Sequence, residues 1–243
     1  MGIARFAVLS DGTFFLPVNS FRQHEKRLRK AQQALSRKVK ASHNWRKAKK
    51  RVQRIHARIA NVRRDFLHKV SAAICKNHAI VCIEDLQVRN MSRSAAGTAA
   101  TPGKNVRAKS GLSKSILDQG WHEFRRQLEY KLAWSGGRLI VVPPQNTSRT
   151  CPCCGHVSAN NRPTQARFAC VQCGFEANAD VVGAINILSR GMQIMRDEGR
   201  DTTDASVGRL ACASVSPDGL WIEPHKRSEA GTHRSDYAKE SDA

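Results

Sequence analysis

The sequence predicts an α/β protein with a long, basic helical hairpin and a zinc ribbon. Short apolar runs typical of buried strands alternate with longer segments of helical periodicity. Two Cys-x2-Cys motifs, with fifteen residues between them, follow the last apolar run. With 243 residues, the chain is long enough for one or two domains with a hydrophobic core.

The net charge predicts a polyanionic partner. The chain carries 41 Lys and Arg against 20 Asp and Glu, a formal charge of +21. Residues 1–190 hold 34 of these basic residues and 10 of the acidic ones, so the excess belongs to the part that we expect to fold. Nucleic acid is the partner that such a charge favours, and a membrane surface is the weaker alternative.

Two further observations concern location. No apolar run approaches the roughly 20 residues that a membrane span needs. Residues 1–5 lack the charged region and following apolar core of a signal peptide. We therefore expect a cytoplasmic protein with no membrane partner and no small-molecule substrate.

A β-hairpin is expected over residues 3–18. Two apolar runs rich in β-forming residues flank the dipeptide Asp11-Gly12, which is typical of a tight turn. The first run begins almost at Met1, so the predicted first strand has nothing before it to lead into it.

Two helices are expected over residues 20–78, with a break near residues 40–44. Ser20 is the expected N-cap of the first helix. From Trp45 to Ile74, apolar residues recur at steps of three and four, which is the period of an amphipathic helix with one face on a core.

The predicted helical hairpin is strongly basic, with 18 Lys and Arg against two acidic residues across residues 22–69. A solvated helix face could explain a charge run, but an excess of one sign repels itself, and a phosphate backbone would relieve that repulsion. The predicted nucleic-acid contacts are Arg46, Lys47, Lys49, Lys50, Arg51, Arg54 and Arg58.

Residues 79–86 form an apolar run that ends in Glu84 and Asp85. A fully apolar strand is expected at a central position in a sheet. Adjacent residues of an extended chain point to opposite sides, so one carboxylate would face a pocket at the end of the strand. The alternative is that both acids lie in a solvated loop.

The next segment combines a loop, a helix and a strand. Residues 87–111 are polar and small, which predicts a flexible basic loop. A helix is expected from about Ser113 to the pair Gly136-Gly137, followed by a short buried strand over residues 138–142.

The cysteine pairs Cys151/Cys154 and Cys170/Cys173 have the spacing of a zinc ribbon. Two residues between thiolates let one turn place both sulfurs about 2.3 Å from a metal ion. Two such turns complete a closed four-sulfur shell, so we expect one structural Zn2+. The alternatives are a pair of disulfides, which a reducing cytosol disfavours, and unrelated cysteines. Cys153 could replace Cys154 only with Cys-x-Cys spacing, which fits the turn less well.

Asp180 follows the ribbon, in the first turn of a predicted short helix that ends near residue 191. A helix N-cap is the simple explanation of this residue. Asn178 and Asn186 are further polar candidates near the same site. Residues 192–243 have mixed charge and few apolar side chains, which predicts a mostly disordered tail.

Glu84 and Asp180 stand out among the few acids of this basic chain. Acids at the end of a strand and the start of a helix, in a nucleic-acid-binding chain, suggest phosphodiester cleavage with two Mg2+ ions about 3.5–4 Å apart. Two carboxylates are too few for the usual form of this site. Asp11 cannot supply the missing one, because it lies at the wrong end of its strand.

Four stretches of the chain together resemble the C-terminal half of TnpB, the OrfB-type transposon-encoded protein with a RuvC-like nuclease domain. The resemblance covers about residues 1–190. Members of this family, long described as transposases, are RNA-guided DNA endonucleases that bind a guide RNA made from the transposon end. The four stretches are GIARFAVLSDG at the start, IVCIEDL around Glu84, SRTCPCCGHVS with FACVQCG, and ANADVVGAINIL around Asp180.

The resemblance implies an RNase H-like (RuvC-like) mixed sheet with helices, into which the zinc ribbon is inserted. It implies Glu84 and Asp180 as the second and third acids of the catalytic site, and it supports the four cysteines as zinc ligands. It also implies DNA and guide RNA as partners, DNA recombination by transposition as the setting, and Mg2+ as the catalytic cofactor of the intact parent.

The implied domains follow the motifs. Residues 1–147 are the first part of the RuvC-like domain, including the basic hairpin 20–78; residues 148–176 are the zinc ribbon, residues 177–191 the last RuvC-like segment, and residues 192–243 the tail.

The chain departs from the family at its start. The first catalytic aspartate of the family lies in a strand of the form Gly-Ile-Asp-x-Gly-Ile, of which Met1-Gly2-Ile3 matches only the end. The resemblance therefore implies an N-terminally truncated transposase with an incomplete first strand, which binds nucleic acid but cuts DNA poorly or not at all. The alternatives are a nuclease-dead, nucleic-acid-binding regulator and a plain zinc-ribbon binding protein.

Overall fold

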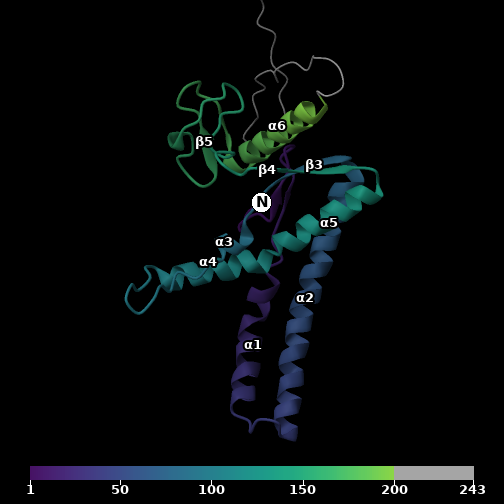
Figure 1. Cartoon of the computed structure of the whole chain (residues 1–243), viewed down its shortest axis with the longest axis vertical. Coiled ribbons are helices and arrows are strands. Elements are labelled where there is room, and N and C mark those ends of the chain that lie inside the picture. Colours follow the sequence, from purple (N-terminus) through teal and green to yellow (C-terminus); the bar gives the residue numbers. More distant parts are fainter. Residues whose placement is uncertain (200–243) are drawn as a thin grey trace, which may run out of the picture.

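The computed structural model describes residues 1–199, and most of the predicted tail lies outside them. The described chain is an α/β structure with three two-stranded sheets. A long helical hairpin extends at one end, the cysteine-rich segment lies at the other, and a small parallel sheet lies between them (Figure 1).

The predicted N-terminal hairpin is present. Strand β1 (Ala7–Val8) pairs antiparallel with β2 (Phe14–Phe15). Gly12 turns the chain with φ of 88°, a conformation that glycine adopts without steric cost. The Asp11 carboxylate accepts the N–H of Thr13 at 2.8 Å, which fixes the turn.

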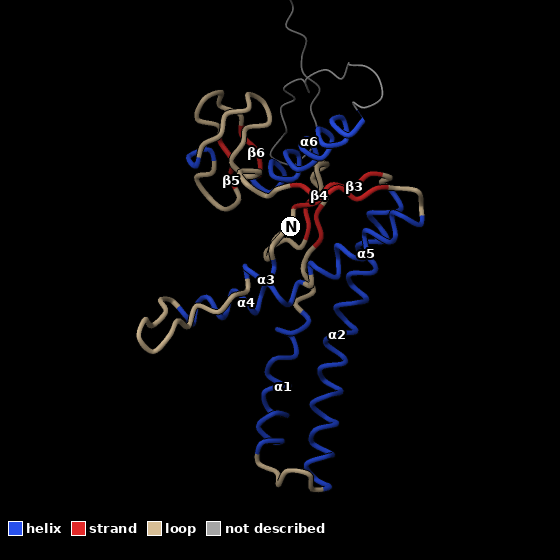
Figure 2. The backbone as a smooth tube through the Cα atoms, viewed as in Figure 1, coloured by secondary structure: helices blue, strands red, loops and turns tan. Residues whose placement is uncertain are grey.

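The basic segment forms two long helices that run side by side (Figure 2). Helix α1 (Ser20–Ser36) and helix α2 (His43–Asn77) are joined by a short loop at the predicted break. The hydroxyl of Ser42 caps α2 by accepting the N–H of Trp45 at 3.1 Å. A small core of Leu28, Ala31, Ile55 and Ile59 joins the two helices along their facing stripes.

The parallel sheet consists of β3 (Ile80–Glu84) and β4 (Arg138–Val142), in register from Ile80 opposite Arg138 to Glu84 opposite Val142. It lies between α6 (Ala179–Gly199) and α5 (Trp121–Trp134) (Figure 1).

The expected central position of β3 is wrong for the described residues, where β3 pairs with β4 alone. Helices cover both of its faces. Val81 and Ile83 pack on the main core, whereas Cys82 packs with Ile140 and Ile187 on the other side. Because helices cover both faces of β3, its side chains are apolar up to Glu84, although only one of its edges is paired.

The segment between the sheet strands differs from the prediction. Helix α3 (Val88–Met91) and the start of α4 (Val106–Gln119) lie inside the predicted flexible loop 87–111. The predicted single helix is two helices, because Gly120 ends α4 with φ of 72° and α5 begins at the next residue. A Cβ at Gly120 would come within 3.0 Å of the Arg63 side chain of α2, so close packing also favours glycine there.

The C-terminal part contains the cysteine-rich segment and the last helix. The segment carries a short 3-10 helix (Ala159–Asn161) and the antiparallel strands β5 (Arg167–Ala169) and β6 (Glu176–Asn178). Helix α6 runs to Gly199, so the prediction that the tail begins at residue 192 is wrong for residues 192–199. Ile194 and Met195 continue the apolar face of α6 onto β4, which extends the helix.

The main core lies where α2, α5 and the N-terminal hairpin meet. Phe6 is fully buried, and its ring packs edge-on against Phe66 of α2 and Phe124 of α5, with ring centroids 5.1 and 4.9 Å away. Phe6 therefore anchors the hairpin to the helices, together with Ala7, Leu9 and Phe15, which pack on the same core.

Asp118 of α4 caps α1 from outside that helix. Asn19 precedes α1 in a left-handed conformation and makes no side-chain cap. The buried carboxylate of Asp118 instead accepts the hydroxyl of Ser20 and the N–H groups of Phe21 and Arg22. The expectation that Ser20 is the N-cap is therefore wrong: Ser20 is the first helical residue, and a distant carboxylate satisfies the free N–H groups.

We expect Asp118→Ala to lower the free energy of unfolding by about 1–3 kcal/mol, because buried amide and hydroxyl donors lose their acceptor. Chemical denaturation followed by circular dichroism measures the change. Asp65→Ala is the matched control: its ion pair with Lys69 is exposed, so it should change stability by less than about 0.5 kcal/mol. Equal effects of the two substitutions would contradict the capping role.

Candidate functional site

The cysteine-rich segment forms two matching turns. In the first, Gly155 donates its N–H to the carbonyl of Cys151 at 2.9 Å, and in the second Gly174 donates to Cys170 at 3.0 Å. Both glycines have positive φ, 78° and 74°, which such turns require. The glycine after each Cys-x2-Cys motif therefore shapes the turn that points two thiols in one direction.

The four predicted ligands come together. The sulfurs of Cys151, Cys154, Cys170 and Cys173 all lie within 4.8 Å of one another. The cross-turn pairs Cys151–Cys173 and Cys154–Cys170 are both 3.6 Å apart. Four thiolates at about 2.3 Å from one ion would be separated by roughly 3.8 Å, so this arrangement fits a tetrahedral metal site. The cluster uses Cys154, as expected, and not Cys153.

The surroundings shift the pKa values of the Cys151 and Cys170 thiols in opposite directions. Burial raises the pKa of Cys151 to about 12. Burial also acts to raise the pKa of Cys170, but the N–H groups of Cys173 and Gln172 outweigh it and hold that pKa near 7. A metal ion that binds all four sulfurs must displace these protons, so metal binding releases protons.

The two carboxylates at the end of β3 diverge, as expected for adjacent residues of an extended chain. Asp85 donates its N–H to Val142, and its carboxylate accepts Arg125 at 2.8 Å and Gln87 at 3.0 Å. Glu84 turns to the other side, where its side chain is 15% exposed. Its oxygens lie 3.4 Å from the hydroxyl of Thr147 and 3.5 Å from the amino group of Met1.

Asp180 lies in the first turn of α6. It is not the cap of the helix, because the side chain of Asn178 accepts its N–H at 3.0 Å. The carboxylate is 39% exposed, and Arg162 of the cysteine-rich segment lies 3.7 Å from it. Asp180 is thus left available to a ligand, except for this long ion pair.

Glu84 and Asp180 line the same cavity, whose volume is about 300 Å3. Thr147, Ser148 and Arg162 complete its polar wall, and the N-terminal residues 1–5 lie across it. Residues 96 positions apart in the chain therefore meet at one polar cavity. Two carboxylates beside hydroxyl and guanidinium groups form a donor set that could hold a divalent cation and a phosphate.

Asn186 positions the wall of this cavity. Its side-chain amide donates to the carbonyls of Thr147 at 2.7 Å and Thr150 at 2.8 Å. Thr147 is buried and reaches Glu84 with its hydroxyl, so Asn186 connects α6 to the Glu84 side of the cavity. Of the two predicted asparagines, one caps α6 and the other fixes this loop.

Thr147 and Arg162 are among the cavity residues that were not predicted from the sequence. Thr147 lies in a loop without a recognisable motif, and Arg162 is one of many basic residues. Arg162 Nε is buried without a hydrogen-bond partner in the described structure, although a buried guanidinium nitrogen normally has one. Only the folded structure distinguishes this arginine from those on the surface.

The basic hairpin carries a groove of about 860 Å3 between α1 and α2. Four predicted contacts line it: Lys47, Arg51, Arg54 and Arg58. They follow steps of four, three and four residues, so they share one face of α2. The predicted residues Arg46, Lys49 and Lys50 lie outside the groove, whereas His24 and Arg27 of α1, which were not predicted, line it.

Family comparisons match both halves of the chain. Residues 1–95 match the OrfB_IS605 model, described as a probable transposase, and residues 121–187 match the Cas12f1-like TNB domain. The resemblance to the OrfB/TnpB family is therefore confirmed. No helix in residues 1–199 is long and apolar enough to cross a membrane.

Curated relatives carry consistent names. The chain is 58% identical over 194 residues to the putative RNA-guided DNA endonuclease InsQ of Escherichia coli (strain K12), a match that covers 80% of this chain and 48% of InsQ. It is 38% identical over 192 residues to a putative RNA-guided DNA endonuclease of Streptomyces pristinaespiralis, with 79% and 44% covered. The chain thus spans about half the length of these relatives.

Among solved structures, the chain is similar to a Cas12f1–sgRNA–target DNA complex. The TM-score is 0.44 and the sequence identity 20%, with 72% of this chain and 43% of that chain covered.

We expect the reduced chain to hold one metal ion, bound by four sulfurs at about 2.3 Å. Elemental analysis and X-ray absorption measure the content and the ligands. Cys170→Ser should lose the ion, whereas Cys153→Ser, the neighbouring control outside the cluster, should keep it. A folded, reduced preparation without metal, or loss of the ion in the control alone, would contradict the assigned ligand set.

Proposed function

We propose that this chain provides the nucleic-acid-binding and RuvC-like part of a TnpB-type RNA-guided DNA endonuclease. DNA and guide RNA are its partners, and the setting is transposition. The observation that carries the proposal is the meeting of Glu84 and Asp180 in one cavity. The relatives named above, whose names describe putative RNA-guided DNA endonucleases, support it.

The proposed architecture is RNase H-like. The antiparallel β1–β2 hairpin, the parallel β3–β4 pair and the flanking helices α5 and α6 support this assignment. The proposed division is a RuvC-like part over residues 1–147 and 177–191, interrupted by a zinc ribbon over residues 148–176.

Two kinds of metal ion, Zn2+ and Mg2+, have separate roles in this proposal. The four-cysteine cluster holds Zn2+, because four thiolates in a closed shell suit that ion and leave no site for substrate. Glu84 and Asp180 would hold Mg2+, which prefers carboxylates with water and substrate phosphate. Mg2+ would activate water and stabilise the leaving oxygen.

Within this cavity, the chain's own groups have distinct tasks. The hydroxyl of Thr147 lies 3.1 Å from the carbonyl of Pro144 and 3.4 Å from Glu84, so it fixes the loop beside that carboxylate, and Asn186 holds Thr147 in place. Arg162 balances the charge of Asp180 and offers an unused N–H group to an anion. Of the described residues that line the cavity, only Glu84 and Asp180 are acidic, whereas a two-metal site typically needs a further carboxylate.

The acid count keeps a second candidate function open, a nuclease-dead regulator that binds nucleic acid. Both functions predict binding by the helical hairpin, and they differ in cleavage. Mg2+-dependent cutting of DNA by the full chain, abolished by Glu84→Ala, would establish the nuclease. Binding without cutting in the presence of Mg2+ would favour the regulator.

For the acidic cavity, we expect Glu84→Gln and Asp180→Asn to weaken Mn2+ binding by more than the roughly tenfold that loss of an outer-shell partner costs. Mn2+ serves as the paramagnetic probe, and its binding to the DNA-bound chain is measured by electron paramagnetic resonance. Asp85→Asn is the control, because Asp85 lies on the other side of the strand and binds Arg125. If Asp85→Asn lost as much affinity as the other two, the assignment would be wrong.

For the hairpin, we expect the double variant Arg51→Gln/Arg54→Gln to weaken nucleic-acid binding and to reduce the slope of log K against log salt by about two. The control variant Arg46→Gln/Lys50→Gln removes the same charge from the same helix outside the groove. Titrations over a range of salt concentrations separate the two variants. Equal losses would mean that net charge, and not the groove, binds the phosphates.

A further inference from the structure

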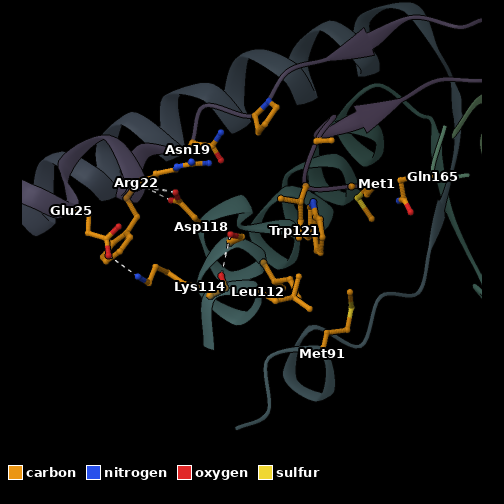
Figure 3. Close-up of a pocket in the computed structure, with 18 residues that line it drawn as sticks. Met1, Asn19, Arg22, Glu25, Met91, Leu112, Lys114, Asp118, Trp121 and Gln165 are labelled. Atoms are coloured by element: carbon orange, nitrogen blue, oxygen red, sulfur yellow. Dashed lines mark hydrogen bonds and ion pairs between the residues drawn. The ribbon is translucent and has the colours of Figure 1, made fainter. Parts of the chain in front are cut away.

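A second, larger cavity adjoins the acidic one. Its volume is about 820 Å3, and it lies among the start of α1, residues 111–118 of α4, Trp121 and residues 1–4 (Figure 3). Residues 1–4 and Gln165 line both cavities, so the two cavities are neighbours. A nucleic-acid strand held at Glu84 and Asp180 would therefore pass close to this second cavity.

Trp121 supplies an unused hydrogen-bond donor at the cavity wall. The residue is 4% exposed, and its indole Nε1 has no partner among the described residues. A buried indole N–H normally finds an acceptor. In Figure 3, Trp121 lies between Met1 and Leu112, two other residues of the wall. A ligand with an acceptor atom would satisfy this donor.

The rest of the lining combines apolar side chains with two cations and two acids. Met91, Leu112 and Ile116 contribute apolar atoms, and Arg22 and Lys114 are the cations. Lys114 pairs with Glu25 at 2.6 Å. An aromatic ring beside apolar side chains and cations suits a nucleobase with its phosphate. The volume is within the range of pockets that hold small ligands.

The wall also carries two acidic groups, Glu25 and Asp118, and both already have partners. Glu25 is paired with Lys114. Asp118 accepts the N–H of Phe21 at 2.9 Å and the hydroxyl of Ser20 at 3.1 Å. Its carboxylate is therefore bound to the start of α1. This occupation reduces the repulsion that a phosphate would otherwise meet in the cavity.

We propose that this cavity receives one unstacked nucleotide of the single strand that passes the acidic cavity. The base lies against Trp121 and Leu112, the indole N–H donates to an acceptor on the base, and Arg22 and Lys114 face the phosphate. Enzymes that handle single strands bind unstacked bases in this way, on aromatic and apolar surfaces. The proposal rests on the proposed function, because it needs a strand at Glu84 and Asp180.

The test compares two single-stranded probes on the full chain in its reduced, metal-loaded form. One is a fluorescein-labelled oligothymidylate, and the other is an abasic oligonucleotide of equal length and charge. Because the phosphates are the same, the ratio of the two dissociation constants reports the bases alone. Fluorescence anisotropy measures both constants.

We expect the wild-type chain to prefer the thymidylate by about tenfold. Leu112→Trp fills the cavity mouth from a residue that is 46% exposed, and it should reduce the preference to near unity. Leu117→Trp is the control: Leu117 lies on the same helix and is 53% exposed, but it does not line the cavity. This variant should keep the tenfold preference.

Equal binding of both probes by the wild type, or a full preference in Leu112→Trp, would overturn the proposal and leave nucleic-acid binding by the hairpin intact. If neither probe bound at all, the proposed function would be overturned as well. Trp121→Phe keeps an aromatic ring in the core and removes the N–H group, so its preference should fall severalfold. An unchanged preference in Trp121→Phe would overturn the role of the indole donor.

Discussion

The parallel pairing of β3 with β4 is the contact on which the acidic cavity depends. It places Glu84 opposite Val142, so the strand that carries the acid ends where β4 leads into the loop of Thr147. Helix α6 then crosses the pair, and Gly191 lies so close to it that a Cβ there would come within 2.2 Å of the Cys82 sulfur. Glycine at this position lets α6 lie flat on the sheet, which brings Asp180 to the same cavity as Glu84.

Local signals predicted much of this structure. Asp11-Gly12 located the hairpin, because few dipeptides turn two strands so tightly. The three- and four-residue steps of apolar side chains located α1 and α2, and the spacing of Cys151, Cys154, Cys170 and Cys173 predicted a cluster that the fold assembles. In each case the residues that form the pattern are near one another in sequence. The sequence pattern alone is therefore enough to predict the structure that these residues form.

Long-range contacts explain what the sequence did not reveal. The break at Gly120 follows from packing on Arg63, and the cap of α1 comes from Asp118, about a hundred residues away. The last turns of α6 are held by Ile194 and Met195 on β4, in a stretch whose composition alone resembles a tail. Thr147 and Arg162 are ordinary residues in sequence, and only the tertiary fold places them beside the acids. The roles of Glu84 and Asp180 stay predictions, supported by their common cavity.

The cysteine-rich segment is bounded at both ends by the acidic cavity. The chain enters it just after Thr147 and leaves it just before Asp180, and both residues line that cavity. Ala179 also donates its N–H to Ala166 inside the segment, at 2.7 Å. The four sulfurs therefore close a loop whose two ends are walls of the site. A metal ion bound by the four sulfurs would thus fix the course of the chain between Thr147 and Asp180, two walls of the cavity, without touching either acid.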